Sequence, residues 1–235
     1  MFTSDHFIWL GLSAVFVVGM LIFSIKKKLS LKTAGYIMTA ICAFSEISKI
    51  MDDMTESAEG GMHLDPGSLP FHLCSLLLFG VLFITFGKDG KLKQTVVNFL
   101  SVAGVIGSLC ALLIPTSGTN FAKLGPYQCF VYHAALMWFA IYLIISKKAD
   151  LGLSTYIRNM IILLALVFAM IYVNSVLSVY DTNFMYLVRP PMEDLPYLNL
   201  NAGWYAYFLR LVALGVGIIS AFHLPFIISE RKKSK

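Results

Sequence analysis

Residues 6–28 read HFIWLGLSAVFVVGMLIFSIKKK, an apolar run that ends in three lysines. A helix needs about 20 mostly apolar residues to cross a hydrocarbon layer about 30 Å thick. This run therefore predicts a membrane-spanning helix. Lysines follow the run and no basic residue precedes it, which is the reverse of a secretory signal, so we expect the helix to be retained.

Six further apolar runs follow the first along the chain. Of the 235 residues, 58% are hydrophobic and 13% are charged, whereas soluble domains carry about 25% charged residues. The seven predicted helices cover residues 6–25, 31–51, 70–86, 93–114, 127–146, 156–179 and 203–228. Because no repeat or low-complexity linker separates them, we expect an all-α polytopic membrane bundle with one transmembrane domain over residues 1–235.

The basic residues predict the orientation of this bundle. Fourteen of the 18 lysines and arginines lie in four segments that seven alternating helices place on one side, namely residues 26–32, 88–93, 147–158 and 231–235. The positive-inside rule makes this side cytoplasmic, so we expect the N-terminus outside and the C-terminus in the cytoplasm. The acidic side chains between Asp52 and Asp65, which include Glu59, then lie outside. Nothing in the chain resembles a nucleic-acid-binding module, and we expect no nucleic-acid partner.

Two opposite charges lie within the second predicted helix. Glu46 and Lys49 are three residues apart, on a stripe that also contains Gly35, Cys42 and Asp53. A charged side chain in hydrocarbon costs at least a few kcal/mol, so this stripe must face protein. The simplest interpretation is an ion pair on one helix face, which requires no function.

Polar residues from five or more predicted helices fall at one level of the membrane. By the helical rise they lie within roughly 10 Å of the outer border. They are Glu46, Cys74, His133, Asn174, Asn183 and Arg210. Because unrelated structural features would spread through the membrane thickness, the shared level indicates a functional site in the outer leaflet.

The residue types at this level are those of acyl transfer. Cys74 is a nucleophile as its thiolate, and His133 is the candidate base that removes the thiol proton. His72 is a poorer candidate base, because positions i and i+2 of a helix point apart unless the chain after the proline at position 70 is not yet helical. Glu46 is predicted to orient the imidazole, and Arg210 to hold a phosphate or stabilise an oxyanion.

Other roles for the cysteines remain open at this point. From spacing alone, Cys74 fits a small core residue, or a disulfide to Cys110 or Cys129, better than it fits a catalytic residue. The four cysteines form no CxxC pair and no zinc-binding spacing, so we expect no metal site, and no cofactor is predicted.

A function of another class also remains open. Glu46, Lys49, His133 and Arg210 would suit a charge-paired passage in a lipid- or ion-binding or transport protein without catalysis. A passage predicts polar residues through both leaflets, and the inner half of the predicted bundle contains few.

Several residues outside this level receive structural predictions. Gly104 and Gly107 in the fourth predicted helix, and Gly215 and Gly217 in the last, are predicted to be close helix-packing sites. His223, near the cytoplasmic end, is predicted to be an interfacial histidine.

Residues 69–75 read LPFHLCS, and further elements follow this motif in order along the chain. They are LIP at residues 113–115, His133, TNFMYL at residues 182–187, Pro190, and GWY at residues 203–205, with Glu46 before them. In these elements the chain resembles the YwaF-type family of bacterial integral membrane proteins, which is related to vertebrate transmembrane protein 164. The resemblance implies CoA-independent transfer of fatty acyl groups between phospholipids, with Cys74 and His133 as the catalytic pair. A more distant similarity to the androgen-induced hydrolases, which cleave fatty acid esters, also implies lipid acyl chemistry.

The residues and the resemblance together predict lipid acyl chemistry. A site in the outer half of the bilayer cannot readily use cytosolic acyl-CoA, so we expect both donor and acceptor to be membrane lipids, a phospholipid and a lysophospholipid. The expected protein is a lipid acyltransferase, or a lipid ester hydrolase, of the bacterial cytoplasmic membrane that acts through a thioester on Cys74.

Overall fold

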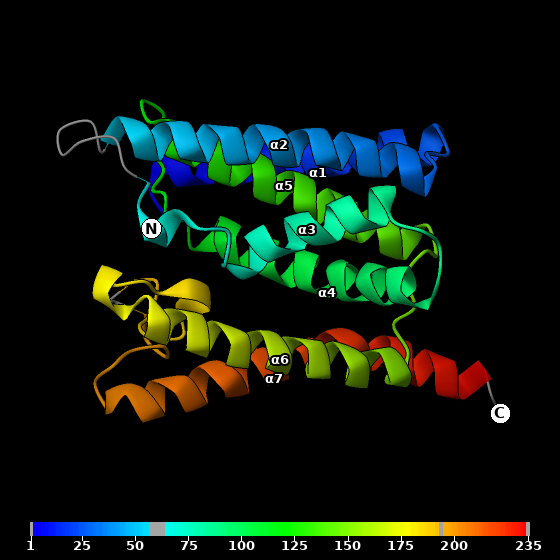
Figure 1. The fold of residues 1–235 in the computed structure, drawn as a ribbon. Helices are drawn as coiled ribbons and strands as arrows, with labels where there is room; N and C mark the ends of the chain where they lie inside the picture. Colours follow the sequence, from blue (N-terminus) through cyan, green and yellow to red (C-terminus); the bar gives the residue numbers. More distant parts are fainter. Residues whose placement is uncertain (1, 57–63, 193–194, 234–235) are drawn as a thin grey trace.

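The computed structural model describes residues 2–56, 64–192 and 195–233. Within these ranges the chain forms seven α-helices and three short 3-10 helices, and it contains no strand, which confirms the all-α prediction. The predictions for Glu59 and for the last basic residue, Lys235, fall outside the described residues. Figure 1 shows the helices lying alongside one another, with the N- and C-termini at opposite ends.

The observed helices agree closely with the predicted runs. They are α1 (Ser4–Lys26), α2 (Leu31–Glu56), α3 (Leu73–Phe86), α4 (Lys91–Leu113), α5 (Leu124–Ile145), α6 (Leu153–Val176) and α7 (Gly203–Lys233). Each begins within three residues of its predicted start. The helices α2 and α7 continue past their predicted ends because charged and polar residues extend a helix as well as apolar residues do.

Five of these helices, α1, α4, α5, α6 and α7, are long and apolar enough to cross a membrane. The other two each lack one of these properties. The helix α2 has 26 residues but carries several charges toward its C-terminal end. The helix α3 is apolar but has 14 residues, which rise about 21 Å, less than the hydrocarbon thickness of about 30 Å.

The helix α5 lies at the centre of the best-packed part of the protein. Its Trp138 indole donates to the Ser24 hydroxyl at 3.0 Å, and the Tyr142 hydroxyl donates to the Leu29 carbonyl at 2.8 Å, which fixes α5 to the end of α1. On another side, a Cβ added at Gly104 would lie 2.9 Å from Ala140 Cβ. Glycine therefore allows α4 to approach α5, which confirms the prediction for Gly104.

The helices α6 and α7 form a pair that lies beside α4, drawn yellow-green and orange to red in Figure 1. At the N-terminal end of α6, the Glu230 carboxylate of α7 accepts from the Leu153 amide at 3.2 Å. Away from such links, α7 is mostly exposed. Among the described residues, a Cβ at Gly215 or Gly217 would have no neighbour within 4 Å, so the prediction that these glycines are close packing sites is wrong.

The start of α3 differs from the prediction. Asp65 caps a 3-10 helix at Pro66–Ser68, Leu69 is extended as residues before a proline usually are, and Pro70 lies in a turn. His72 is the extended N-cap residue of α3, with φ −68° and ψ 150°. The helix thus begins three residues after the predicted start. His72 and Cys74 are therefore not held apart by helical geometry.

Candidate functional site

A cavity of about 470 Å³ lies between α4 and the α6–α7 pair and reaches α2, α5 and the start of α3. This volume is within the range of small-molecule sites, about 300–1,000 Å³. Five of the eight predicted site residues line it: Glu46, Lys49, His72, Cys74 and His133. The other three, Asn174, Asn183 and Arg210, are not part of its lining.

Cys74 is held by a hydrogen bond to its backbone and lies next to a glycine. The Tyr132 hydroxyl of α5 donates a hydrogen bond of 2.6 Å to the Cys74 carbonyl. On α4, a Cβ added at Gly107 would lie 3.4 Å from the Cys74 sulfur, so glycine leaves space next to the thiol. Cys74, Cys110 and Cys129 are all free thiols in this structure.

The ring of His133 is oriented by its own helix. Its Nδ1 lies 2.7 Å from the carbonyl oxygen of Cys129, one turn earlier. Since a carbonyl oxygen only accepts, Nδ1 carries the hydrogen and Nε2 is the basic nitrogen. Among the described residues Nε2 has no hydrogen-bond partner. The imidazole therefore has a basic nitrogen available for a proton from another group.

Cys129 is a second thiol near this ring, and sequence reasoning gave it no role there. Its sulfur lies 3.6 Å from His133 Nδ1. That nitrogen already carries its hydrogen for the Cys129 carbonyl, so it cannot also remove a proton from the Cys129 thiol. The spacing of four residues on one helix was the available signal for this contact.

Glu46 and Lys49 form the predicted ion pair, with Lys49 Nζ 2.8 Å from Glu46 Oε2. Gly35 and Cys42 of the same stripe are buried, while Ile47 on the opposite face is exposed, so the stripe faces protein as predicted. The group that orients His133 in this structure is the Cys129 carbonyl, whereas Glu46 is occupied by Lys49.

His72 packs among aromatic rings just before α3. Its ring centroid lies 5.2 Å from that of Tyr186 and 5.5 Å from that of Phe184. Its ring lines the cavity at this point.

The comparison with protein families matches almost the whole chain. The sequence model of the TMEM164 family aligns with residues 1–222. The chain belongs to the TMEM164 family. This confirms the predicted relation to transmembrane protein 164, and together with the five long apolar helices it identifies an integral membrane protein. No significant match is found among curated proteins or solved structures.

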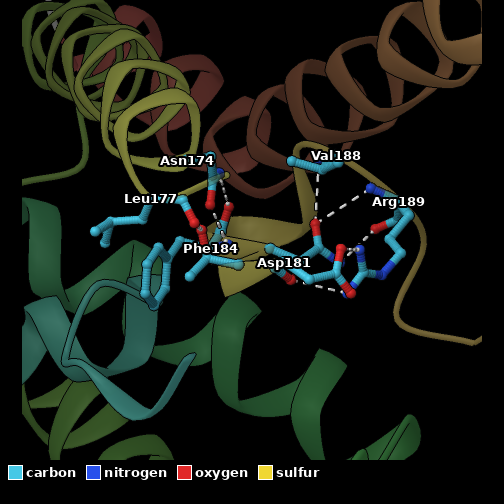
Figure 2. A network of polar contacts seen from close by, with 8 residues as sticks. Asn174, Leu177, Asp181, Phe184, Val188 and Arg189 are labelled. Atoms are coloured by element: carbon cyan, nitrogen blue, oxygen red, sulfur yellow. Dashed lines mark hydrogen bonds and ion pairs between the residues drawn. The ribbon is translucent and has the colours of Figure 1, made fainter. Parts of the chain in front are cut away.

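In this TMEM164-family protein, the segment between α6 and α7 covers part of the cavity, and two asparagines shape the segment. Figure 2 shows Asn174 of α6 beside Phe184 of this segment. Asn174 Nδ2 donates to the Phe184 carbonyl at 3.0 Å, and Asn174 Oδ1 accepts from the Phe184 amide at 2.8 Å. Asn183 makes a similar set of bonds with Val188 and Arg189. Both asparagines therefore position backbone rather than contact the cavity.

Arg210 of the TMEM164-family chain lies on α7 near the same segment. Its guanidinium donates to Asn199 Oδ1 at 3.2 Å. Within residues 2–56, 64–192 and 195–233, no group of three or more His, Cys, Asp or Glu side chains is arranged to hold a metal ion.

Proposed function

We propose that this protein is a membrane-embedded lipid acyltransferase in which Cys74 is the nucleophile and His133 the general base. The observation that carries the proposal is that both side chains line one cavity, with His133 Nε2 free to accept a proton. Tyr132, the residue before His133, bonds the Cys74 carbonyl and links the two elements. Membership of the TMEM164 family supports the same chemistry.

We further propose that all seven helices cross the bacterial cytoplasmic membrane, with the N-terminus outside. The charged stripe of α2 faces protein, so α2 can cross although it carries charges. The termini at opposite ends of the bundle fit an odd number of crossings (Figure 1). Cys74, at the N-terminal end of α3, then lies in the outer half of the membrane, where phospholipid and lysophospholipid are the available donor and acceptor.

The reaction balances without a cofactor. His133 Nε2 takes the thiol proton, and the Cys74 thiolate attacks an ester carbonyl of a phospholipid. The ester C–O bond breaks, the lysophospholipid leaves with the proton from His133, and the acyl group stays on sulfur. The hydroxyl of a second lysophospholipid then gives its proton to Nε2 and attacks the thioester, which releases the Cys74 thiolate to be reprotonated. Water in place of this hydroxyl gives hydrolysis.

The polar end of the cavity is the proposed place of the lipid headgroup. Lys49 and Glu46 lie there with His72, and these side chains favour a zwitterionic or anionic group over hydrocarbon. Arg210 is proposed to reach the headgroup phosphate once substrate is bound, which requires its guanidinium to leave Asn199.

Acyl exchange in vesicles tests the proposal. Purified protein is reconstituted with labelled phosphatidylcholine and unlabelled lysophosphatidylcholine, and transfer of the labelled chain is measured. Cys74→Ala is expected to lower the rate by about 100-fold or more, since it removes the bond-forming group. Cys110→Ala removes another thiol from the same cavity and is expected to change the rate by less than about twofold. Equal exchange by wild type and Cys74→Ala would reject the mechanism.

The same experiment separates the second candidate function, a lipid-binding or transport protein without catalysis. The mostly apolar lining of the cavity favours this alternative, because such a lining can hold lipid without any reaction. Vesicle lipid bound by the wild-type protein with no exchange would support it.

A further inference from the structure

The part of the cavity that extends along α4 from Gly107 toward Phe99 is an apolar groove that leads away from Cys74. Phe99, Ala103 and Ile106 line it from one face of α4, and Gly107 beside the Cys74 sulfur belongs to the same face. From Gly107 to Phe99 the helical rise gives about 12 Å. One leaflet of the hydrocarbon core is about 15 Å deep, so the groove beyond the thiol has the length of most of one lipid chain.

The opposite wall comes from α7. Leu211, Gly215 and Ile219 follow one another at intervals of four residues and also cover about 12 Å. Leu214 and Ile218 line the cavity and are exposed as well, so the groove reaches the lipid-facing surface of α7. A hydrocarbon chain can therefore enter from the side without passing through water.

Gly215 provides part of the space. It lines the cavity, and a Cβ added there would meet nothing within 4 Å. Gly217 is equally open, but it does not line the cavity. The two glycines are thus matched positions on one helix, of which only Gly215 borders the groove.

A polar side chain, Asn159, lies at the far end of the groove, and we call it the polar floor of the groove. Asn159 of α6 is 2% exposed and lines the cavity, and its Oδ1 has no hydrogen-bond partner in the part of the chain that the structure describes. Its Nδ2 lies 3.3 Å from His223 Nε2, and His223 Nδ1 lies 3.0 Å from the Leu151 carbonyl. Because that carbonyl only accepts, Nδ1 carries the hydrogen and Nε2 accepts from the asparagine. Asn159 Oδ1 is then the remaining acceptor.

His223, which is fully buried, therefore holds the amide of Asn159 in place. A water molecule can serve the free Oδ1, whereas a methylene chain cannot. A chain that reaches this point must leave a buried acceptor unpaired, which is unfavourable. The polar floor thus opposes entry of a longer chain.

We propose that this groove binds one fatty acyl chain of a membrane glycerolipid and that Asn159 limits the length of the chain that fits. The inference rests on the proposed function in one respect, the placement of the ester carbonyl at Cys74. The groove itself, its lateral opening and its polar floor are independent of catalysis, so binding is the property to measure.

Photolabelling of the full-length Cys74→Ala protein tests the groove, because this variant cannot react. The probe is phosphatidylcholine with a diazirine near the end of one acyl chain, and labelled peptides are located by mass spectrometry. Labelling of residues 159–163 and 215–219 is expected to saturate and to be displaced by unlabelled phosphatidylcholine. Added Gly215→Leu fills the groove and is expected to weaken labelling about tenfold. Added Gly217→Leu is expected to change it by less than about twofold.

Competition between the photolabel and unlabelled phosphatidylcholines of increasing chain length tests whether the polar floor limits the length of the bound chain. Chains that fit the groove are expected to compete about equally, because the bilayer that they leave is as apolar as the groove, whereas chains long enough to meet Asn159 are expected to compete about fivefold more weakly. Asn159→Leu, which makes the floor apolar, is expected to move this limit to longer chains. Asn159→Ala, which also removes the buried acceptor, serves the same purpose if the leucine variant does not fold.

Three results would overturn the inference. They are labelling that does not saturate, equal effects of Gly215→Leu and Gly217→Leu, and a chain-length limit that is unchanged in the Asn159 variants. Normal groove labelling in a protein whose wild type shows no acyl exchange would instead reject the proposed function and leave the groove in place.

Discussion

Tyr132 and His133 are neighbours on α5 that connect two parts of the candidate site. The Tyr132 hydroxyl binds the backbone at Cys74, while the His133 ring is held by the Cys129 carbonyl and leaves Nε2 free. One turn of one helix thus positions both the thiol-bearing segment and the proposed base.

Tyr132→Phe removes the hydrogen bond to Cys74 and leaves the ring in place. The lost bond is expected to lower the free energy of unfolding by about 1 kcal/mol, and acyl exchange is expected to fall because the start of α3 is less well positioned. Tyr142→Phe is the control, since its hydroxyl binds the Leu29 carbonyl elsewhere on α5. It should cost similar stability, measured by thermal melting, and leave exchange unchanged. Equal exchange in both variants would show that the Tyr132 bond is structural only.

Side-chain spacing predicted part of this site and missed the rest. The Glu46–Lys49 pair was predictable because both residues lie on one helix. The Asn159–His223 contact was not, because it joins α6 to α7 and sequence spacing gives no information on how separate helices are rotated toward each other. Gly215 was misassigned for the same reason: a glycine in a membrane helix usually marks a close contact, and here it borders a cavity.

The segment between α6 and α7 is the element that brings these parts together. Asn174 fixes Phe184, which is fully buried and packs against Phe71 with ring centroids 5.2 Å apart and against His72. An asparagine on α6 therefore influences the start of α3 through one aromatic ring.

Asn174→Ala leaves the amide and carbonyl of Phe184 without their partner. The expected cost is about 1–3 kcal/mol, seen as a lower melting temperature, together with slower acyl exchange because the support of His72 is lost. Asn201→Ala, at an exposed position of the same segment, is expected to change neither quantity. Full stability and exchange in Asn174→Ala would show that this segment is held by other contacts.

The helix boundaries were predictable wherever apolar length determined them. The start of α3 was not, because Pro70 is compatible both with a first helical turn and with the turn that precedes α3. The capped 3-10 helix at Pro66–Ser68 selects the second arrangement. This difference matters for the site, since it leaves His72 outside the helix that carries Cys74.

For the protein as a whole, the hydropathy of the sequence predicted the helices, and the distribution of charge predicted an orientation in the membrane. The cavity was not predictable in this way, because it depends on how the helices pack. Five helices have the length and composition of membrane spans, whereas α2 carries several charges and α3 has only 14 residues. A cavity between α4 and the α6–α7 pair is a property of helix arrangement that no single segment encodes.

Reporter fusions in a bacterial membrane test the topology. A reporter active only outside the cytoplasm is expected to work at the N-terminus, and one active only inside is expected to work at the C-terminus and in the basic connection at residues 88–93. Both termini on one side would mean an even number of crossings and would remove either α2 or α3 from the set of spans.

The central claim is that an acyl group resides on the Cys74 sulfur during turnover. Wild-type protein is incubated with phosphatidylcholine vesicles without acceptor, quenched with acid, and its intact mass and peptides are measured. The expected result is one added acyl group on the peptide that contains Cys74, released by neutral hydroxylamine as thioesters are, greatly reduced in His133→Ala and absent in Cys74→Ala. Acyl transfer that proceeds with no adduct on Cys74, or with the adduct on Cys129, would contradict the account.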